Sequence, residues 1–130
     1  MLNLFRRTLP SFDHALSCDV CGAIAWRAHT GTVWYTDEHG VVISGLVNTR
    51  LADIRHAKTI DRLLNANRIA ALHRFLIRKK IVDQGIDAYC PECDRIYCGK
   101  HYTTSVSFDD GFYDCTDAVC PQGHSRTIDD

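Results

Sequence analysis

The chain has 130 residues, a formal net charge of −1 and 45% hydrophobic residues. This length suits one domain, 1–130, with a core of its own, and the balanced charge argues against a protein whose main partner is a phosphate backbone. The sequence contains no run of about 18 apolar residues, so no segment is expected to span a membrane.

The segment before the first cysteine, 1–16, is expected to be an extended lead-in and not a targeting signal. Arg6 and Arg7 are not followed by the apolar stretch of a secretory signal, because Pro10 and Asp13 interrupt it. We therefore expect a cytoplasmic protein whose thiols stay reduced. The odd number of cysteines, seven, also fits a disulfide framework poorly.

Residues 18–48 begin with a knuckle of the kind that binds metal and continue as β-structure. The knuckle is CDVCG, and three β-branched or aromatic runs follow it. We predict strands near 23–28, 32–36 and 41–47, with the turn sequence DEHG between the last two. This part of the chain is therefore expected to form a small antiparallel sheet.

Residues 49–82 are predicted to be a helical insertion. Neither glycine nor proline occurs over 49–80, and one broad apolar stripe has helical period. The stripe is made of Ile60, Leu63, Leu64, Ala71, Leu72, Phe75 and Leu76. It predicts one long helix over 59–80, with a shorter helix at 50–57 before it. Basic residues outside the stripe predict a solvated face, with contact to an acidic ligand as the alternative. They are Arg62, Arg68, Arg74, Arg78, Lys79 and Lys80.

Residues 86–130 are predicted to be short strands and further metal-type knuckles. The runs IDAY, YTTSVSF and GFYDCT have strand character, and DDG at 109–111 is typical of a hairpin turn. The chain ends with a knuckle, CPQGH, and a short tail. The pattern as a whole predicts an α+β fold, with a small antiparallel sheet, one long helix and a zinc-stapled region.

Four ligand pairs are distributed along the chain: Cys18/Cys21, Cys90/Cys93, Cys98/His101 and Cys120/His124. Two such ligands in a tight turn can point at one Zn²⁺, and structural zinc is tetrahedral with Cys and His ligands and no open position. Eight ligands would therefore saturate two structural zinc ions. The seventh cysteine, Cys115, is left over. It is expected to pack as a small hydrophobic residue or to replace one of the eight ligands.

Catalytic motifs that use the same residue types do not occur in this sequence. The CPEC motif at 90–93 is followed by another knuckle and not by the helix of a thioredoxin-like site. The chain has neither the H-x-E of zinc deaminases nor the H-E-x-x-H of zincins, and it has no P-loop or G-x-S-x-G motif. We therefore expect no enzymatic activity.

The four pairs can be combined into two sites in three ways: sequential, cross-brace or nested. The four residues between Cys93 and Cys98 let the chain pass from one metal to another, but they are tight for two knuckles that close on one ion. The segment CPECDRIYCGKH resembles the C-x2-C-x4-C-x2-C/H centre of cross-brace, treble-clef zinc modules of the FYVE and RING-like group. The sites that this resemblance implies are Cys18, Cys21, Cys98, His101 and Cys90, Cys93, Cys120, His124.

If both zinc ions are structural, the function is expected to lie on a surface, and we predict a protein-binding module. The ending YC…HY…CPQGH…IDD is similar to small bacterial zinc proteins of the immunity type, which implies that the chain masks a protein partner. Acidic and aromatic residues suit such a contact. The predicted contact residues are Asp109, Asp110, Phe112, Tyr113 and Asp114. The alternatives are a nucleic-acid-binding zinc protein that uses the basic 59–80 segment and a RING- or FYVE-like adaptor.

Overall fold

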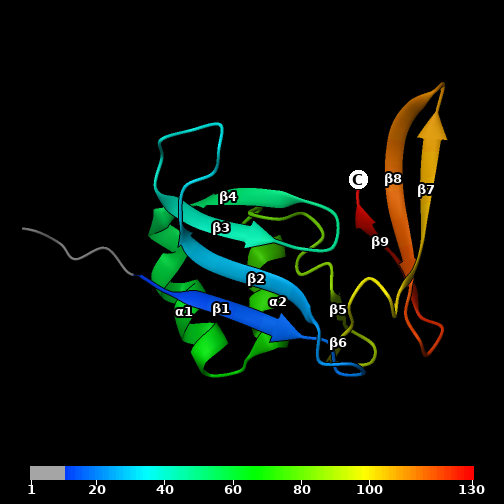
Figure 1. The fold of residues 1–130 in the computed structure, drawn as a ribbon, viewed down its shortest axis with the longest axis horizontal. Coiled ribbons are helices and arrows are strands. Elements are labelled where there is room, and N and C mark those ends of the chain that lie inside the picture. Colours follow the sequence, from blue (N-terminus) through cyan, green and yellow to red (C-terminus); the bar gives the residue numbers. More distant parts are fainter. Residues whose placement is uncertain (1–10) are drawn as a thin grey trace, which may run out of the picture.

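The computed structural model describes residues 11–130, which form an α+β fold of three small antiparallel sheets and two short α-helices (Figure 1). The first ten residues of the expected lead-in lie outside the described range. The described end of the lead-in is regular, because Asp13–Ser17 forms strand β1. Neither α-helix of residues 11–130 has the length and apolar character needed to cross a bilayer.

The first sheet is a four-stranded antiparallel meander in the order β1-β2-β3-β4. Its other strands are β2 (Ile24–Gly31), β3 (Gly40–Ser44) and β4 (Thr49–Asp53). Strands β1 and β4 form its two edges. Apolar side chains of β2 and β3, among them Trp26 and Val41, face the core and are buried.

Two elements predicted for this region, a strand at 32–36 and a short helix at 50–57, are wrong. Residues 32–36 belong to the connection between β2 and β3, where Trp34 is 95% exposed. The other segment begins as β4, in which Leu51 pairs with Val42 and Ala52 with Val41. Pairing with β3 supplies ladder hydrogen bonds and a buried face, and these outweigh the helical preference of the local sequence.

The long helix predicted over 59–80 is also wrong, because the chain breaks in its middle. The helical segments are the 3₁₀ turn η2 (Ile54–His56), α1 (Ala57–Asn65) and α2 (Ile69–Arg78). Asn67, between the α-helices, has a φ of 53°, and the Arg68 N–H donates back to the Leu63 carbonyl at 2.9 Å. A left-handed residue of this kind ends an α-helix. Both helices present apolar residues to the same core, so the periodicity of the sequence continues through the break.

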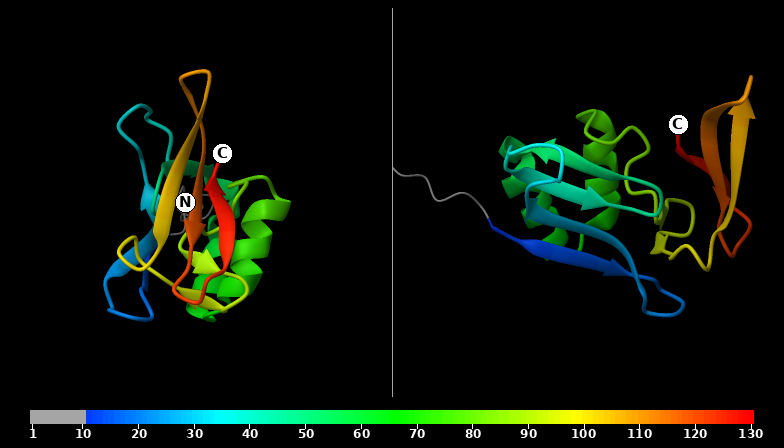
Figure 2. Two further views of the ribbon diagram at one scale, coloured as in Figure 1. Left: turned by 90° about the vertical axis from the view of Figure 1, so that its right-hand side faces the viewer. Right: turned by 45° about the horizontal axis from the view of Figure 1, so that its top comes forward.

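The main core lies between the first sheet and the two helices, which cover one of its faces (Figures 1 and 2). Ile60 of α1 and Leu72 and Leu76 of α2 are fully buried, as is Val41 of the sheet. Burial of each such side chain contributes about 1.5–3 kcal/mol to the free energy of unfolding. This sheet-and-helix unit is therefore the apolar support from which the remaining elements extend.

Beyond α2 the chain forms two further sheets. Their strands are β5 (Tyr89–Cys90), β6 (Arg95–Ile96), β7 (Thr103–Asp109), β8 (Phe112–Val119) and β9 (Ser125–Asp129). Strands β5 and β6 pair with each other, and the third sheet has the order β7-β8-β9. Asp110 and Gly111 have φ values of 49° and 81° and form the tight turn between β7 and β8. In Figure 1 the β7–β8 hairpin projects away from the first sheet.

A half-buried arginine joins the third sheet to the rest of the fold. The guanidinium of Arg126 in β9 donates to the carbonyls of Ile86 and Tyr89, both at 2.8 Å, and to two further carbonyls nearby. Beside it the Asp87 carboxylate accepts the N–H groups of Leu46 and Val47 at 2.8 and 3.2 Å. These bonds hold the β3–β4 turn, the segment before β5 and strand β9 together.

Candidate metal centres

Two groups of side chains in residues 11–130 converge as metal ligands do, and each contains three cysteines and one histidine. In the first group Cys18 and Cys21 follow β1, and Cys98 and His101 follow β6. The Cys18 Sγ and Cys98 Sγ atoms lie 3.5 and 3.3 Å from His101 Nδ1, and the Cys21 and Cys98 sulfurs are 3.6 Å apart. The group joins chain segments that are 83 residues apart.

The second group joins the knuckle at β5 to the knuckle that precedes β9. The Nδ1 atom of His124 lies 3.7, 3.2 and 3.3 Å from the sulfurs of Cys90, Cys93 and Cys120, respectively. The sulfurs of Cys93 and Cys120 are 3.7 Å apart. In each group all four ligand atoms lie within 4.8 Å of one another.

These separations fit a tetrahedral zinc site and do not fit a disulfide. Zn–S and Zn–N bonds of about 2.3 and 2.05 Å place tetrahedral ligand atoms about 3.8 Å apart for two sulfurs and about 3.6 Å for sulfur and nitrogen. The observed sulfur–sulfur contacts are 3.6 and 3.7 Å, whereas a disulfide bond is about 2.05 Å long. Each group can therefore enclose one ion with four protein ligands.

The knuckles share a local backbone design. In each of them, an N–H three or four residues after the first ligand donates to the carbonyl of that ligand, as Gly22 does to Cys18 at 2.9 Å and Asp94 to Cys90 at 2.8 Å. Gly22, Asp94 and Gly123 have φ values of 77°, 54° and 89°, a region that glycine and aspartate tolerate better than most residues. The short turns aim both ligands of a pair at one point.

Backbone donors favour the thiolate form at two of the ligand sulfurs, those of Cys18 and Cys120, whereas burial raises the pKa of Cys90 to about 11. Burial raises the pKa of Cys18, but hydrogen bonds from the backbone of Cys21 and Cys98 outweigh it and lower the pKa to about 6. Burial opposes ionisation of Cys120 in the same way, and backbone hydrogen bonds, the first from His124, bring its pKa to about 7. The His124 N–H lies 3.4 Å from the Cys120 sulfur.

The two groups interleave along the chain, with the first pair joined to the third and the second to the fourth. This is the grouping that the cross-brace resemblance implied. The chain between Cys93 and Cys98 crosses from one group to the other through β6. Ile96 of β6 donates to the Asp19 carboxylate at 2.7 Å, and its carbonyl accepts the Asp19 N–H at 2.8 Å.

Two residues near the ligands were not identified by sequence reasoning. The Asp19 carboxylate accepts the Ile96 N–H and so connects the first knuckle to β6. Glu92 places a carboxylate oxygen 3.9 Å from Nε2 of His124. At this separation the Glu92 carboxylate does not hydrogen-bond the ring, although it is the carboxylate nearest to the second nitrogen of this ligand. The signal for both was their position between the two cysteines of a knuckle, in CDVC and CPEC.

Cys115, the leftover thiol, lies in β8 outside both groups and is half-buried. The expectation that it packs as a buried residue is therefore only partly met. It pairs with Ser107 across the β7–β8 ladder, whereas the eight predicted ligands lie in the knuckles. We do not include Cys115 in either candidate centre.

The residues predicted for partner contact lie together at the end of the β7–β8 hairpin. Phe112 is 76% exposed, and Phe108 and Val106 of β7 add exposed apolar surface next to it. Asp109, Asp110 and Asp114 surround these side chains and are exposed. Tyr113 differs from the others, because its hydroxyl hydrogen-bonds Asp129 of β9 and Thr116.

The comparisons with known proteins identify a family and no characterised relative. The family model described as Domain of unknown function (DUF8328) matches residues 8–130, which include all eight ligand residues. No curated protein and no solved structure matches the chain.

Proposed function

The chain belongs to the family described as Domain of unknown function (DUF8328), and from its own geometry we propose that it is a non-enzymatic, zinc-stabilised protein-binding module. The observation that carries this proposal is the convergence of two complete Cys₃His groups in one short chain. Thiolate and imidazole ligands at tetrahedral separations favour zinc over magnesium or calcium, which prefer oxygen.

A closed ligand shell supports a structural role for both ions. Catalytic zinc sites keep a position for water or substrate beside three protein ligands, whereas each group here supplies four. The cysteines and histidines would hold distant segments together, and zinc would supply the bonds that the short C-terminal strands lack. In this proposal the activity of the chain is the stoichiometric binding of a partner.

The contact surface in this proposal is the outer part of the β7–β8 hairpin, which we call the hairpin tip and define as residues 106–114. It combines exposed Phe108 and Phe112 with the carboxylates of Asp109, Asp110 and Asp114. Aromatic anchors with a charged rim are typical of protein interfaces. The partner that fits is a folded protein with an apolar centre and a Lys- and Arg-rich rim, as an immunity-type protein would mask.

Contacts at the base of the hairpin tip support its use as a preformed surface. Tyr113 is hydrogen-bonded to Asp129, and Asp129 also accepts the side chain of Asn48 from the β3–β4 turn. The hairpin is thus fixed to the first sheet through β9. A surface that is ordered before binding loses less conformational entropy when a partner docks.

The test is charge reversal at the hairpin tip with a matched control. D109K/D110K/D114K and the control D37K/E38K/D83K make the same change in net charge, and all six positions are exposed. The unmodified chain is expected to co-purify from its source cells with one protein at a 1:1 ratio. The hairpin variant should lose this partner, whereas the control should keep it.

Both variants should retain two zinc ions, measured by elemental analysis, so that loss of binding is not loss of folding. Equal binding by the hairpin variant and the control would contradict the proposed surface. Salt-sensitive binding of nucleic acid without a protein partner would favour the alternative that uses the basic residues of α1 and α2. Transfer of ubiquitin, or binding to phosphoinositide vesicles, would favour the RING- or FYVE-like alternative.

A further inference from the structure

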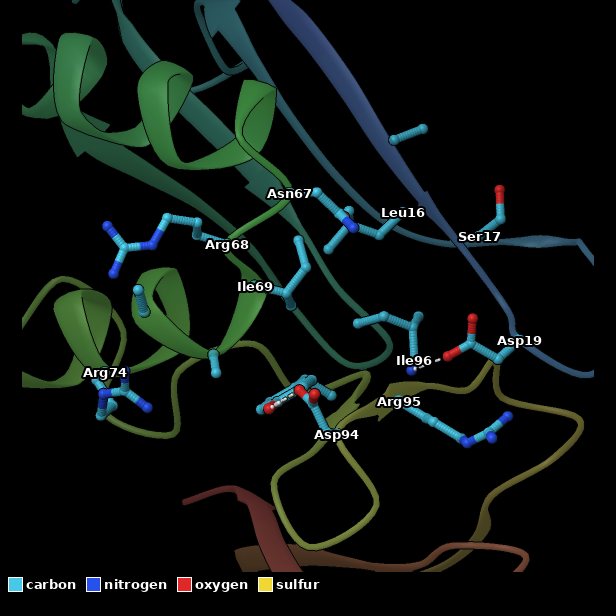
Figure 3. Close-up of a pocket in the computed structure, with 14 residues that line it drawn as sticks. Leu16, Ser17, Asp19, Asn67, Arg68, Ile69, Arg74, Asp94, Arg95 and Ile96 are labelled. Atoms are coloured by element: carbon cyan, nitrogen blue, oxygen red, sulfur yellow. Dashed lines mark hydrogen bonds between the residues drawn. The ribbon is translucent and has the colours of Figure 1, made fainter.

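A groove of about 510 Å³ lies between β1, the start of α2 and the β5–β6 turn, on a different part of the molecule from the hairpin tip. Figure 3 shows Leu16 and Ser17 of β1 on one side and Asn67, Arg68 and Ile69 of the helical side opposite them. The β5–β6 hairpin closes one end of the groove with Asp94 of the turn and Arg95 and Ile96 of β6. The proposed protein-binding function does not use this groove.

The wall formed by β1 is a free strand edge. The Phe12 carbonyl accepts the Thr30 N–H, and the Cys18 N–H donates to the Ala23 carbonyl, so the main-chain groups of even-numbered residues face β2. Successive residues of a strand alternate in this direction. The N–H and C=O groups of Ala15 and Ser17 therefore point away from β2, and both residues line the groove.

The opposite wall and the end of the groove are positively charged. Arg68 and Arg74 come from the helical side and Arg95 from β6, and all three are exposed. Within residues 11–130 none of these guanidinium groups forms an ion pair. The two aspartates of the groove are already engaged, since Asp19 accepts the Ile96 N–H and Asp94 accepts the Tyr89 hydroxyl at 2.5 Å.

The free main-chain groups of β1 favour an acidic peptide over a simple anion as the ligand of this groove. A bound ligand can replace the water on the outward carbonyls of Ala15 and Ser17 only if it has hydrogen-bond donors, which a phosphate dianion or an isolated carboxylate does not have. The backbone of an extended peptide has both donors and acceptors and can pair with a free strand edge. Its side chains alternate in direction, so acidic residues at every second position would meet the arginine side of the groove.

We propose that this groove binds an extended acidic segment of a partner protein, which pairs with β1 as an added strand and places its carboxylates against Arg68, Arg74 and Arg95. Main-chain pairing with β1 supplies most of the directional contacts, and the arginines select for acidic sequence. The surface differs in position and sign of charge from the acidic hairpin tip, so the two surfaces can be tested separately.

The probe is a fluorescent peptide of about six residues with alternating valine and glutamate. Binding is measured by anisotropy against the zinc-loaded chain. The same peptide with lysine in place of glutamate tests the charge requirement, and a version with N-methylated backbone amides tests strand pairing. We expect the unmodified acidic peptide to bind and both controls to fail. Equal binding of the N-methylated peptide would overturn the proposal, because charge alone would then account for affinity.

A pair of charge-matched variants tests the wall of the groove. R68E/R74E reverses two groove arginines, whereas R62E/R78E makes the same change on exposed positions of α1 and α2 outside the groove. The first should weaken peptide binding by about tenfold or more, and the second by less than about threefold. Equal weakening by both variants would overturn the assignment of these arginines to the site.

The location of the peptide is read from the backbone amides of β1. In hydrogen-exchange measurements by NMR, the peptide should slow exchange at Ala15 and Ser17 and leave the already paired His14 and Leu16 unchanged. No added protection at Ala15 would overturn strand addition. Self-association of the free chain that R68E/R74E abolishes would also overturn the proposal, because the occupant would then be a second copy.

Discussion

At the scale of single residues, His73 is a buried titratable group away from the candidate metal centres. It lies in α2, and its Nδ1 accepts the Ile86 N–H at 3.0 Å. Burial lowers the pKa of His73 from 6.5 to about 4, with help from the positive charges of Arg126 and Arg74. The imidazole is therefore neutral in the folded protein at pH values where the unfolded chain binds a proton.

The first prediction concerns the pH dependence that His73 gives to stability. Because its pKa is lower in the folded state, its contribution is fully present above pH 6.5 and is lost as pH falls from 6.5 towards 4. At about pH 5.5 the loss relative to pH 7.5 should be about 1.3 kcal/mol. His73→Asn, whose side-chain oxygen can replace Nδ1 as acceptor, should lack this part of the pH dependence. Urea unfolding at both pH values, with zinc in excess, measures it.

The unmodified chain and His73→Asn carry the same eight ligands, so the pH dependence of zinc binding affects both equally. The difference between their stabilities therefore reports on His73 alone. If the stabilities of the two proteins fall by the same amount between pH 7.5 and 5.5, His73 does not titrate as its burial implies. The sequence puts His73 directly after Leu72 of the apolar stripe, and both side chains are buried in α2. It could not show Arg126 beside it, because that contact depends on how β9 packs.

At the scale of elements, the turn between α1 and α2 sets the position of the groove wall. Asn67 takes a left-handed conformation, with a φ of 53°, and Arg68 follows it at the start of α2. Without this turn the two helices would continue as one, and Arg68 would not lie between Asn67 and Ile69 in the lining of the groove. The break is therefore a structural requirement for the arrangement in Figure 3.

The second prediction is that this position tolerates glycine and not a β-branched residue. Asn67→Gly should leave the free energy of unfolding nearly unchanged, because glycine adopts positive φ readily. Asn67→Val should lower it by about 1–2 kcal/mol, because a left-handed conformation is strained for valine. Denaturant unfolding followed by circular dichroism distinguishes them. Equal stability of the two variants would show that the turn can change conformation at little cost.

Helices and strands that depend on neighbouring residues were predicted correctly from the sequence, whereas those that depend on contacts with distant residues were not. The β7–β8 hairpin was predicted correctly from strand patterns around DDG, because a two-residue turn needs residues such as Asp110 and Gly111 at positive φ. Strand β4 was taken for helix, since its sequence lacks glycine and proline and its partner β3 was not visible to a local pattern. The Asn67 break was missed because the apolar stripe has the same phase on both sides.

At the scale of the whole molecule, the candidate centres connect parts of the chain that also share one continuous cluster of buried apolar residues. Most large aliphatic side chains of this cluster lie in the first sheet and the helices, around Trp26, Ile60 and Leu72. Around β5–β9 the buried side chains include Tyr89, Tyr97 and Tyr102 beside the knuckles, and most of β7 is exposed. The spacing of cysteine and histidine along the sequence identified the four ligand pairs. It did not show which pairs share a metal ion. The grouping of the first pair with the third and of the second with the fourth was implied by a resemblance, and its geometry is seen only in the folded chain.

The third prediction is that zinc holds the C-terminal half in place. The purified chain should contain two zinc ions, and Cys115→Ser should keep both, whereas Cys93→Ser should lose one. Zinc sites can contribute about 10–16 kcal/mol at neutral pH, against net domain stabilities of about 5–15 kcal/mol. Removal of zinc with a strong chelator should therefore increase amide exchange across β5–β9, while the amides of α1, α2 and the first sheet, which contain most of the large buried aliphatic side chains, keep more of their protection.

Hydrogen exchange of the chain with and without chelator, followed by mass spectrometry of its peptides, measures this difference. Return of zinc should restore protection in β5–β9, which distinguishes loss of metal from irreversible damage. Unchanged exchange in β5–β9 after complete removal of zinc would show that Arg126 and the strand ladders suffice to hold this half. Equal loss of protection in both halves would show instead that the first sheet and helices depend on zinc through Cys18 and Cys21, which would make the whole described chain one metal-dependent cooperative unit.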